Sequence, residues 1–180
     1  MSALPSGWWY GFAGPEARRR LAIALALVAP LVLADQALKA WAGGRLALGD
    51  AQPLTSWLNL ALAHNRGAAF SFLSDAGGWQ SGLFLAIGLA ASVLLLALIA
   101  RGAGGAGTRL ALTLILSGAV GNIVDRVRQG YVVDFVDFHV SWLGGLFPGG
   151  HFPAFNLADS AITCGAALLI FEEFRRGRRS

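Results

Sequence analysis

The chain has 180 residues, of which 56% are hydrophobic and only 13% are charged. A soluble domain usually carries about 25% charged residues, so this composition excludes an ordinary soluble protein and indicates an integral membrane protein. The net charge of +4 would suit nucleic-acid binding, but most of the arginines lie at the flanks of apolar runs, as the positive-inside rule expects. We therefore expect no nucleic-acid partner.

The first apolar run covers about residues 21–42 and follows the cluster Arg18, Arg19 and Arg20. It begins like a signal peptide, but no small-residue cleavage site precedes Asp35, which favours an uncleaved span after a cytoplasmic tail of residues 1–20. Asp35 and Lys39 are four residues apart near the outer end of this run. This spacing predicts a structural ion pair, with Lys39 extending toward water.

Residues 43–78 are predicted to form an outward loop with its own local structure. Alternation of side chains over 54–63 predicts a strand of a small sheet on the membrane surface. A turn at Asn65 and Gly67 then leads into a short amphipathic segment.

Three further apolar runs, at about 79–100, 110–126 and 153–172, complete four predicted spans in a single membrane domain of residues 1–180. The glycine-rich link between Arg101 and Arg109 and the C-terminal arginines belong on the cytoplasmic side. Both termini are then cytoplasmic, and the loops 43–78 and 127–152 face outward. The expected fold is an all-α membrane bundle.

Asp134 and Asp159 fall at the predicted outer membrane boundary, where a carboxylate is costly unless it is paired or hydrated. Two adjacent carboxylates hold one proton between them, so one can activate water while the other protonates a carbonyl. That chemistry hydrolyses a peptide without a covalent intermediate. Three alternatives stay open: Asn156 and Asp159 fit a helix N-terminal cap, Asp134 fits an ordinary loop acid, and Asp137 rivals Asp134.

Asn122 and Arg126 lie on one face at the end of the third predicted span, and both side chains suit the backbone carbonyls of an extended peptide. An Asp125–Arg126 pair, or an arginine on a lipid phosphate, would fit the spacing equally. The three histidines, at 64, 139 and 151, lack metal-ligand spacing, and no serine lies in a nucleophile motif. We expect neither a metal nor a serine mechanism.

Four sequence blocks, at residues 35–39, 65–70, 118–126 and 132–135 with 155–160, resemble the bacterial lipoprotein signal peptidase family (signal peptidase II). The resemblance covers nearly all of residues 20–172. It implies four transmembrane helices with a small extracytoplasmic β-cradle and a short surface helix, in a multi-pass protein of the bacterial inner membrane. Within it, Asp134 and Asp159 would be the catalytic dyad. The residues that would line the groove or orient the dyad are Asn65, Gly67, Asn122, Arg126 and Asn156.

The resemblance also implies an activity and partners. The expected enzyme is an aspartic endopeptidase that removes the signal peptide from diacylglyceryl-modified prolipoproteins, cutting before the lipidated cysteine. It needs no cofactor, meets membrane lipids, is inhibited by globomycin and is expected to be a monomer. Two other hypotheses are a proton-coupled membrane carrier that uses the two aspartates as a relay, and a noncatalytic assembly protein. Against the carrier, the acids gather at one membrane face and no internal repeat is visible.

Overall fold

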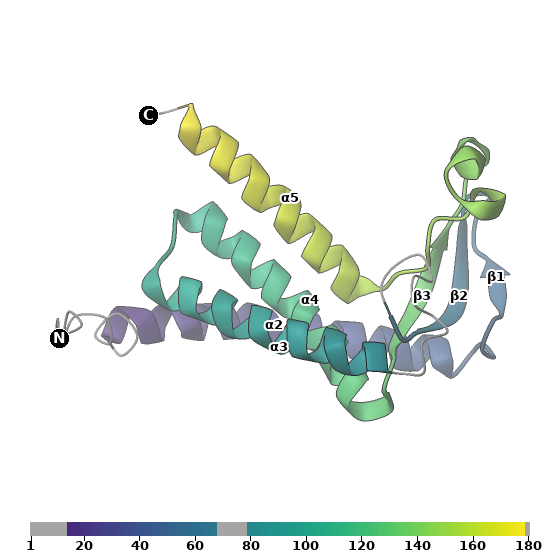
Figure 1. Ribbon diagram of the computed structural model, residues 1–180, viewed down its shortest axis with the longest axis horizontal. Coiled ribbons are helices and arrows are strands. Elements are labelled where there is room, and N and C mark those ends of the chain that lie inside the picture. Colours follow the sequence, from purple (N-terminus) through teal and green to yellow (C-terminus); the bar gives the residue numbers. More distant parts are fainter. Residues whose placement is uncertain (1–13, 68–78, 179–180) are drawn as a thin grey trace.

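The computed structural model describes residues 14–67 and 79–178. Long helices make up most of this part, and a three-stranded sheet stands at one end of them (Figure 1). The start of α2 and the end of α5 both lie at the end opposite the sheet. In chain order the elements are α2 (Pro15–Gly43), β1 (Ala51–Pro53), β2 (Leu58–Asn65), α3 (Trp79–Arg101), α4 (Ala106–Gln129), β3 (Val132–Phe138), the 3₁₀ helices η2 (Ser141–Gly145) and η3 (Pro148–Gly150), and α5 (Leu157–Gly177).

Among the described helices, α2, α3 and α4 are long and apolar enough to cross a membrane. Helix α5 is not in this set, because acidic residues lie near both of its ends: Asp159 in the first turn, and Glu172 and Glu173 near the last. Its 21 residues nevertheless extend about 32 Å at 1.5 Å per residue, which is close to the thickness of a hydrocarbon core.

Helices α2 and α4 extend past both ends of their predicted apolar runs. Helix α2 begins at Pro15, so its first turns fall within the predicted cytoplasmic tail of residues 1–20. Proline is favourable in the first helical turn, where its missing N–H would have had no partner. The helix is continuous through Pro30. Helix α4 extends from Ala106 to Gln129, beyond the predicted 110–126, and ends at Gly130 in the left-handed conformation.

Helices α2, α3 and α4 share an apolar core of aliphatic side chains, which includes Val28, Ile99 and Leu116. Helices α4 and α5 approach each other through glycines. A Cβ at Gly165 would lie 2.7 Å from the carbonyl oxygen of Ala111, and a Cβ at Gly118 would collide with the carbonyl of Ala158. This close contact fixes where α5 begins relative to α4.

The sheet has the antiparallel order β1-β2-β3. The strand predicted at 54–63 exists as β2 at Leu58–Asn65, but its burial does not alternate, because Asn59 through Leu62 are all buried. A register shift between Leu60 and Ala63 disturbs the alternation. Strand β3 lies within the segment that was predicted only as an outward loop. The predicted amphipathic segment after Gly67 falls on residues 68–78, outside the described residues.

Candidate active site

Asn156 connects Asp134 on β3 to Asp159 in the first turn of α5. It is the N-cap of α5 and is fully buried. Its side-chain nitrogen donates to Asp134 Oδ1 at 2.7 Å, and its side-chain oxygen accepts from the backbone nitrogen of Asp159 at 2.8 Å. Its own backbone nitrogen donates to Asp159 Oδ2 at 3.3 Å. The N-cap alternative is therefore confirmed, and the same cap brings the two carboxylates together.

Two more asparagines each donate a hydrogen bond to one of the two aspartates. Asn65, at the end of β2, donates to Asp134 Oδ2 at 3.1 Å, and Asn122 on α4 donates to Asp159 Oδ1 at 2.8 Å. Gly67 donates its backbone N–H to Asn65 Oδ1 at 3.1 Å, which closes the predicted turn and fixes the amide. Each carboxylate is thus oriented by neutral donors from separate elements.

Burial changes the acidity of Asp134, which is only 2% exposed. Loss of water and, second, the neighbouring charge of Asp159 raise the pKa of Asp134 to about 7, against the lowering effect of its hydrogen bonds from Asn65 and Asn156. At neutral pH this carboxyl therefore holds a proton for a large part of the time. One carboxyl that keeps its proton beside a second carboxylate is the arrangement that general acid–base catalysis needs.

A buried cation stands behind the site. Lys39 Nζ pairs with Asp35 at 2.7 Å, as predicted, but also with Asp125 at 2.8 Å, and it donates to Asn122 Oδ1 at 3.3 Å. Lys39 is 4% exposed, so the prediction that it extends toward water is wrong. Two buried carboxylates hold it in place, because an unpaired ammonium there would be costly.

The two carboxylates that pair with Lys39 also accept hydrogen bonds from the backbone next to Asp159 and Asp134. Asp35 Oδ1 accepts the backbone N–H of Ala158 at 3.0 Å, and Asp125 Oδ2 accepts that of Val133 at 3.1 Å. These contacts fix the residues immediately before Asp159 and Asp134. Asp125 therefore pairs with Lys39 and not with Arg126, and sequence spacing could not reveal this, because Lys39 and Asp125 lie on different helices.

Arg126 lies beside Asp134 and Asp159, and one of its donor atoms lacks a hydrogen-bond partner among the described residues. Its guanidinium carbon is 5.5 Å from the ring centroid of Phe84, and its Nη1 is 3.4 Å from the carbonyl oxygen of Asn122. Both catalytic candidates, Asp134 and Asp159, act on it electrostatically. Its Nε is buried and has no hydrogen-bond partner among the described residues.

Asp137, the rival of Asp134, points elsewhere. It lies three residues further along β3, and an odd separation puts two side chains on opposite faces of a strand. Asp137 accepts from Asn59 Nδ2 at 2.7 Å and contacts His151 Nδ1 at 2.9 Å. Together with His139 it forms a second polar cluster. Sequence spacing gave no sign of this cluster, because the loop between β3 and His151 brings its members together.

Comparisons with known proteins identify a family to which this chain is similar. A family model described as "Signal peptidase (SPase) II" matches residues 17–175. A lipoprotein signal peptidase of Paraburkholderia phymatum is 49% identical over 149 residues, covering 82% of this chain and 85% of that protein. One of Ralstonia nicotianae is 48% identical over 148 residues, covering 82% of each. A solved bacterial membrane enzyme superposes with a TM-score of 0.75 at 27% identity, covering 88% of this chain and 92% of its own.

Proposed function

The chain belongs to the signal peptidase II family, the aspartic peptidases of lipoprotein processing, and from this premise we propose how it cuts its substrate. The substrate is a prolipoprotein whose cysteine carries a diacylglyceryl group, and the bond before that cysteine is hydrolysed by Asp134 and Asp159. The observation that supports this most strongly is the double link of Asn156 to the two aspartates. Because the family is one of enzymes, the carrier and assembly hypotheses are set aside.

The proposed reaction gives the two carboxyls different roles. Ionised Asp159 takes a proton from a water molecule, whose oxygen attacks the scissile carbonyl carbon. Protonated Asp134, with its raised pKa, gives its proton to the carbonyl oxygen. The tetrahedral intermediate then collapses: the C–N bond breaks, the leaving amine receives the proton held by Asp159, and the carbonyl re-forms as its hydroxyl proton returns to Asp134. No covalent enzyme intermediate forms, and no metal or cofactor enters these steps.

Neighbouring donors position the peptide in this proposal. Arg126 binds a backbone carbonyl of the substrate through its guanidinium fork, beside Asp134 and Asp159. Asn65, Asn122 and Asn156 orient the carboxylates, and Gly67 fixes Asn65. Asp35 and Lys39 keep a structural role beneath them. Anchoring of the substrate by its apolar helix and acyl chains supplies much of the remaining orientation.

We propose α5 as the fourth span, with the dyad at the outer face of the bacterial inner membrane and both termini in the cytoplasm. The start of α2 and the end of α5 both lie on the side of the molecule away from the sheet, which supports an even number of crossings (Figure 1). Basic residues gather at that end, in the first turns of α2 and the last turn of α5. The sheet would then rest on the outer surface.

A cleavage assay with mass detection tests the proposal. Purified protein in detergent should convert a diacylglyceryl-modified precursor peptide into a product that begins with the lipidated cysteine. Asp134→Asn and Asp159→Asn should each reduce the rate by at least about 10²-fold, the scale of a lost acid–base group. Asp50→Asn is the matched control, because Asp50 lies in an exposed turn and should keep wild-type activity. Cleavage at another bond, or retained cleavage in either dyad variant, would contradict the assignment.

A further inference from the structure

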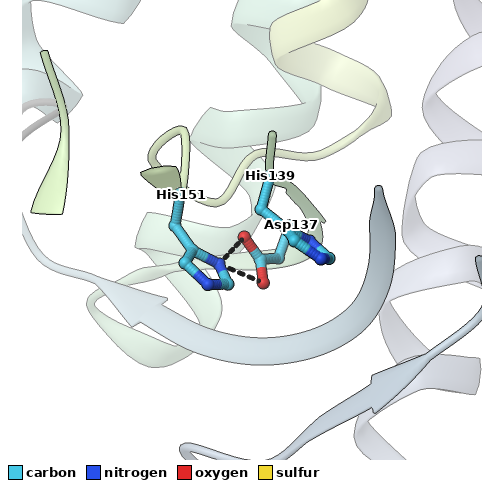
Figure 2. Close-up of side chains that lie close together, drawn as sticks. All are labelled: Asp137, His139 and His151. Atoms are coloured by element: carbon cyan, nitrogen blue, oxygen red, sulfur yellow. Dashed lines mark hydrogen bonds and ion pairs between the residues drawn. The ribbon is translucent and has the colours of Figure 1, made fainter. Parts of the chain in front are cut away.

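The second polar cluster, formed by Asp137, His139 and His151, has the composition of a metal site (Figure 2). Asp137 lies in β3, His139 comes directly after the end of this strand, and His151 follows the 140–150 loop. The loop closes through an antiparallel bridge between His139 and His151, and the Val140 N–H donates to the carbonyl of Gly150 at 3.1 Å. Each of the three side chains offers one ligand atom, and these atoms all lie within 4.8 Å of one another.

Two imidazoles and one carboxylate are ligands that Zn²⁺ prefers, at about 2.0–2.2 Å. Tetrahedral geometry at that length separates ligand atoms by about 3.3 Å. Asp137 Oδ1 and His151 Nδ1 are already 2.9 Å apart. Since no ligand pair exceeds 4.8 Å, a closure of about 1.5 Å completes the set. The half-buried His139 and the exposed His151 can supply it by side-chain rotation.

A buried neighbour orients the carboxylate of Asp137. Asn59 is buried and donates to Asp137 Oδ2 at 2.7 Å, and both carboxylate oxygens of Asp137 lie 2.9 Å from His151 Nδ1. Oriented outer contacts of this kind accompany protein ligands of zinc. The two imidazole rings are stacked, with centroids 4.8 Å apart and planes inclined by 17°. A divalent ion would bind one nitrogen of each imidazole and the carboxylate at the same time. A water molecule would occupy the fourth position.

We propose that Asp137, His139 and His151 bind one zinc-class ion that clips together the two ends of the 140–150 loop. The loop carries the apolar side chains of Trp142 and Leu146, each 73% exposed. Fixing its base therefore fixes an apolar surface at the edge of the sheet. The site lies on the opposite side of β3 from Asp134, and the proposal does not depend on the proposed peptidase chemistry.

Titration of purified full-length protein with Zn²⁺, after removal of any histidine tag, tests the proposal. We expect one ion per chain, and no competition by excess Mg²⁺, which prefers oxygen ligands. His139→Ala and His151→Ala should each weaken binding by at least about 100-fold. The matched control is His64→Ala. His64 lies on β2, stacked on Tyr131 at 3.9 Å between centroids, and is the only other histidine of the chain. This variant should bind as the wild type does.

Hydrogen exchange gives a second readout that does not require activity. Zn²⁺ should slow exchange of the backbone amides of residues 140–150 in the wild type and in His64→Ala, and leave His151→Ala unchanged. The exposed position of His151 makes its removal compatible with folding, which unchanged exchange in the helices would verify. Absence of stoichiometric binding, binding by the two cluster variants as tight as that of the wild type, or displacement by Mg²⁺ would each overturn the proposal.

Discussion

Replacing Asn156 should separate the stability of α5 from the alignment of the dyad. The side chain has two tasks: its oxygen caps the helix by accepting the Asp159 N–H, and its nitrogen holds Asp134. Serine caps helices about as well as asparagine but has no amide to reach Asp134, whereas alanine does neither. Both Asn156→Ser and Asn156→Ala therefore lose the hydrogen bond to Asp134, but only Asn156→Ala also loses the helix cap.

The magnitudes follow from these contacts. Loss of the 2.7 Å hydrogen bond to the carboxyl should lower the free energy of unfolding by about 2 kcal/mol in both variants. Loss of the cap should cost Asn156→Ala about 1 kcal/mol more. Both variants should lose about 10²-fold in kcat/KM, because a displacement of about 1 Å at a reacting group has that effect.

The assay pairs peptide cleavage with denaturant unfolding in the same detergent. Ser160→Ala is a suitable control: its hydroxyl donates to the carbonyl of Asn156 at 3.0 Å without contacting either aspartate, and the variant should stay within about threefold of wild-type activity. An Asn156→Ser variant that cleaves nearly as well as the wild type would contradict a role of the amide in aligning Asp134, as would activity that declines in step with stability across the two variants.

Three further predictions concern the proton, the buried cation and the helix contact. Because the general acid Asp134 has a pKa of about 7, raising the pH removes its proton, and kcat/KM should fall about tenfold per unit above about pH 8; a flat profile to pH 9 would exclude this role. Lys39→Met leaves Asp35 and Asp125 buried without their cation and should lower the free energy of unfolding by about 3–5 kcal/mol, part of which Lys39→Met with Asp125→Asn should restore. Gly118→Ala forces a Cβ against the Ala158 carbonyl and should cost about 1–3 kcal/mol in thermal unfolding. A Cβ at Gly82 would meet no atom of the described residues within 4 Å, so Gly82→Ala should not destabilise; equal effects would contradict the α4–α5 contact.

Local patterns were enough to predict much of the fold. Long apolar runs and flanking arginines predicted helices α2, α3 and α4, and alternation predicted β2, because these signals depend on neighbours within a few residues. The cap at Asn156 was likewise readable from its spacing to Asp159. Strand β3 was missed, since its Asp134 and Asp137 interrupt the apolar pattern and both carboxylates find partners only after the chain has folded.

Contacts between distant residues account for most of what the sequence could not predict. Lys39 has the spacing of a surface ion pair with Asp35, and only the packing of α2 against α4 supplies Asp125 and makes the ammonium a buried one. Spacing likewise left Asp137 as a rival of Asp134, until the face of β3 separated them. The cluster of Asp137, His139 and His151 forms only when the 140–150 loop closes. This loop contains short 3₁₀ helices, and such short elements show little sequence periodicity from which the closure could be predicted.

The central claim, that Asp134 and Asp159 act as one acid–base unit, is tested most directly by a double-mutant cycle on cleavage of the lipidated precursor. Residues that act as a unit are strongly non-additive. We expect Asp134→Asn, Asp159→Asn and the double variant all to retain the same residual rate, within about threefold. Losses that multiply in the double variant would contradict it, as would either single variant that cleaves at close to the wild-type rate.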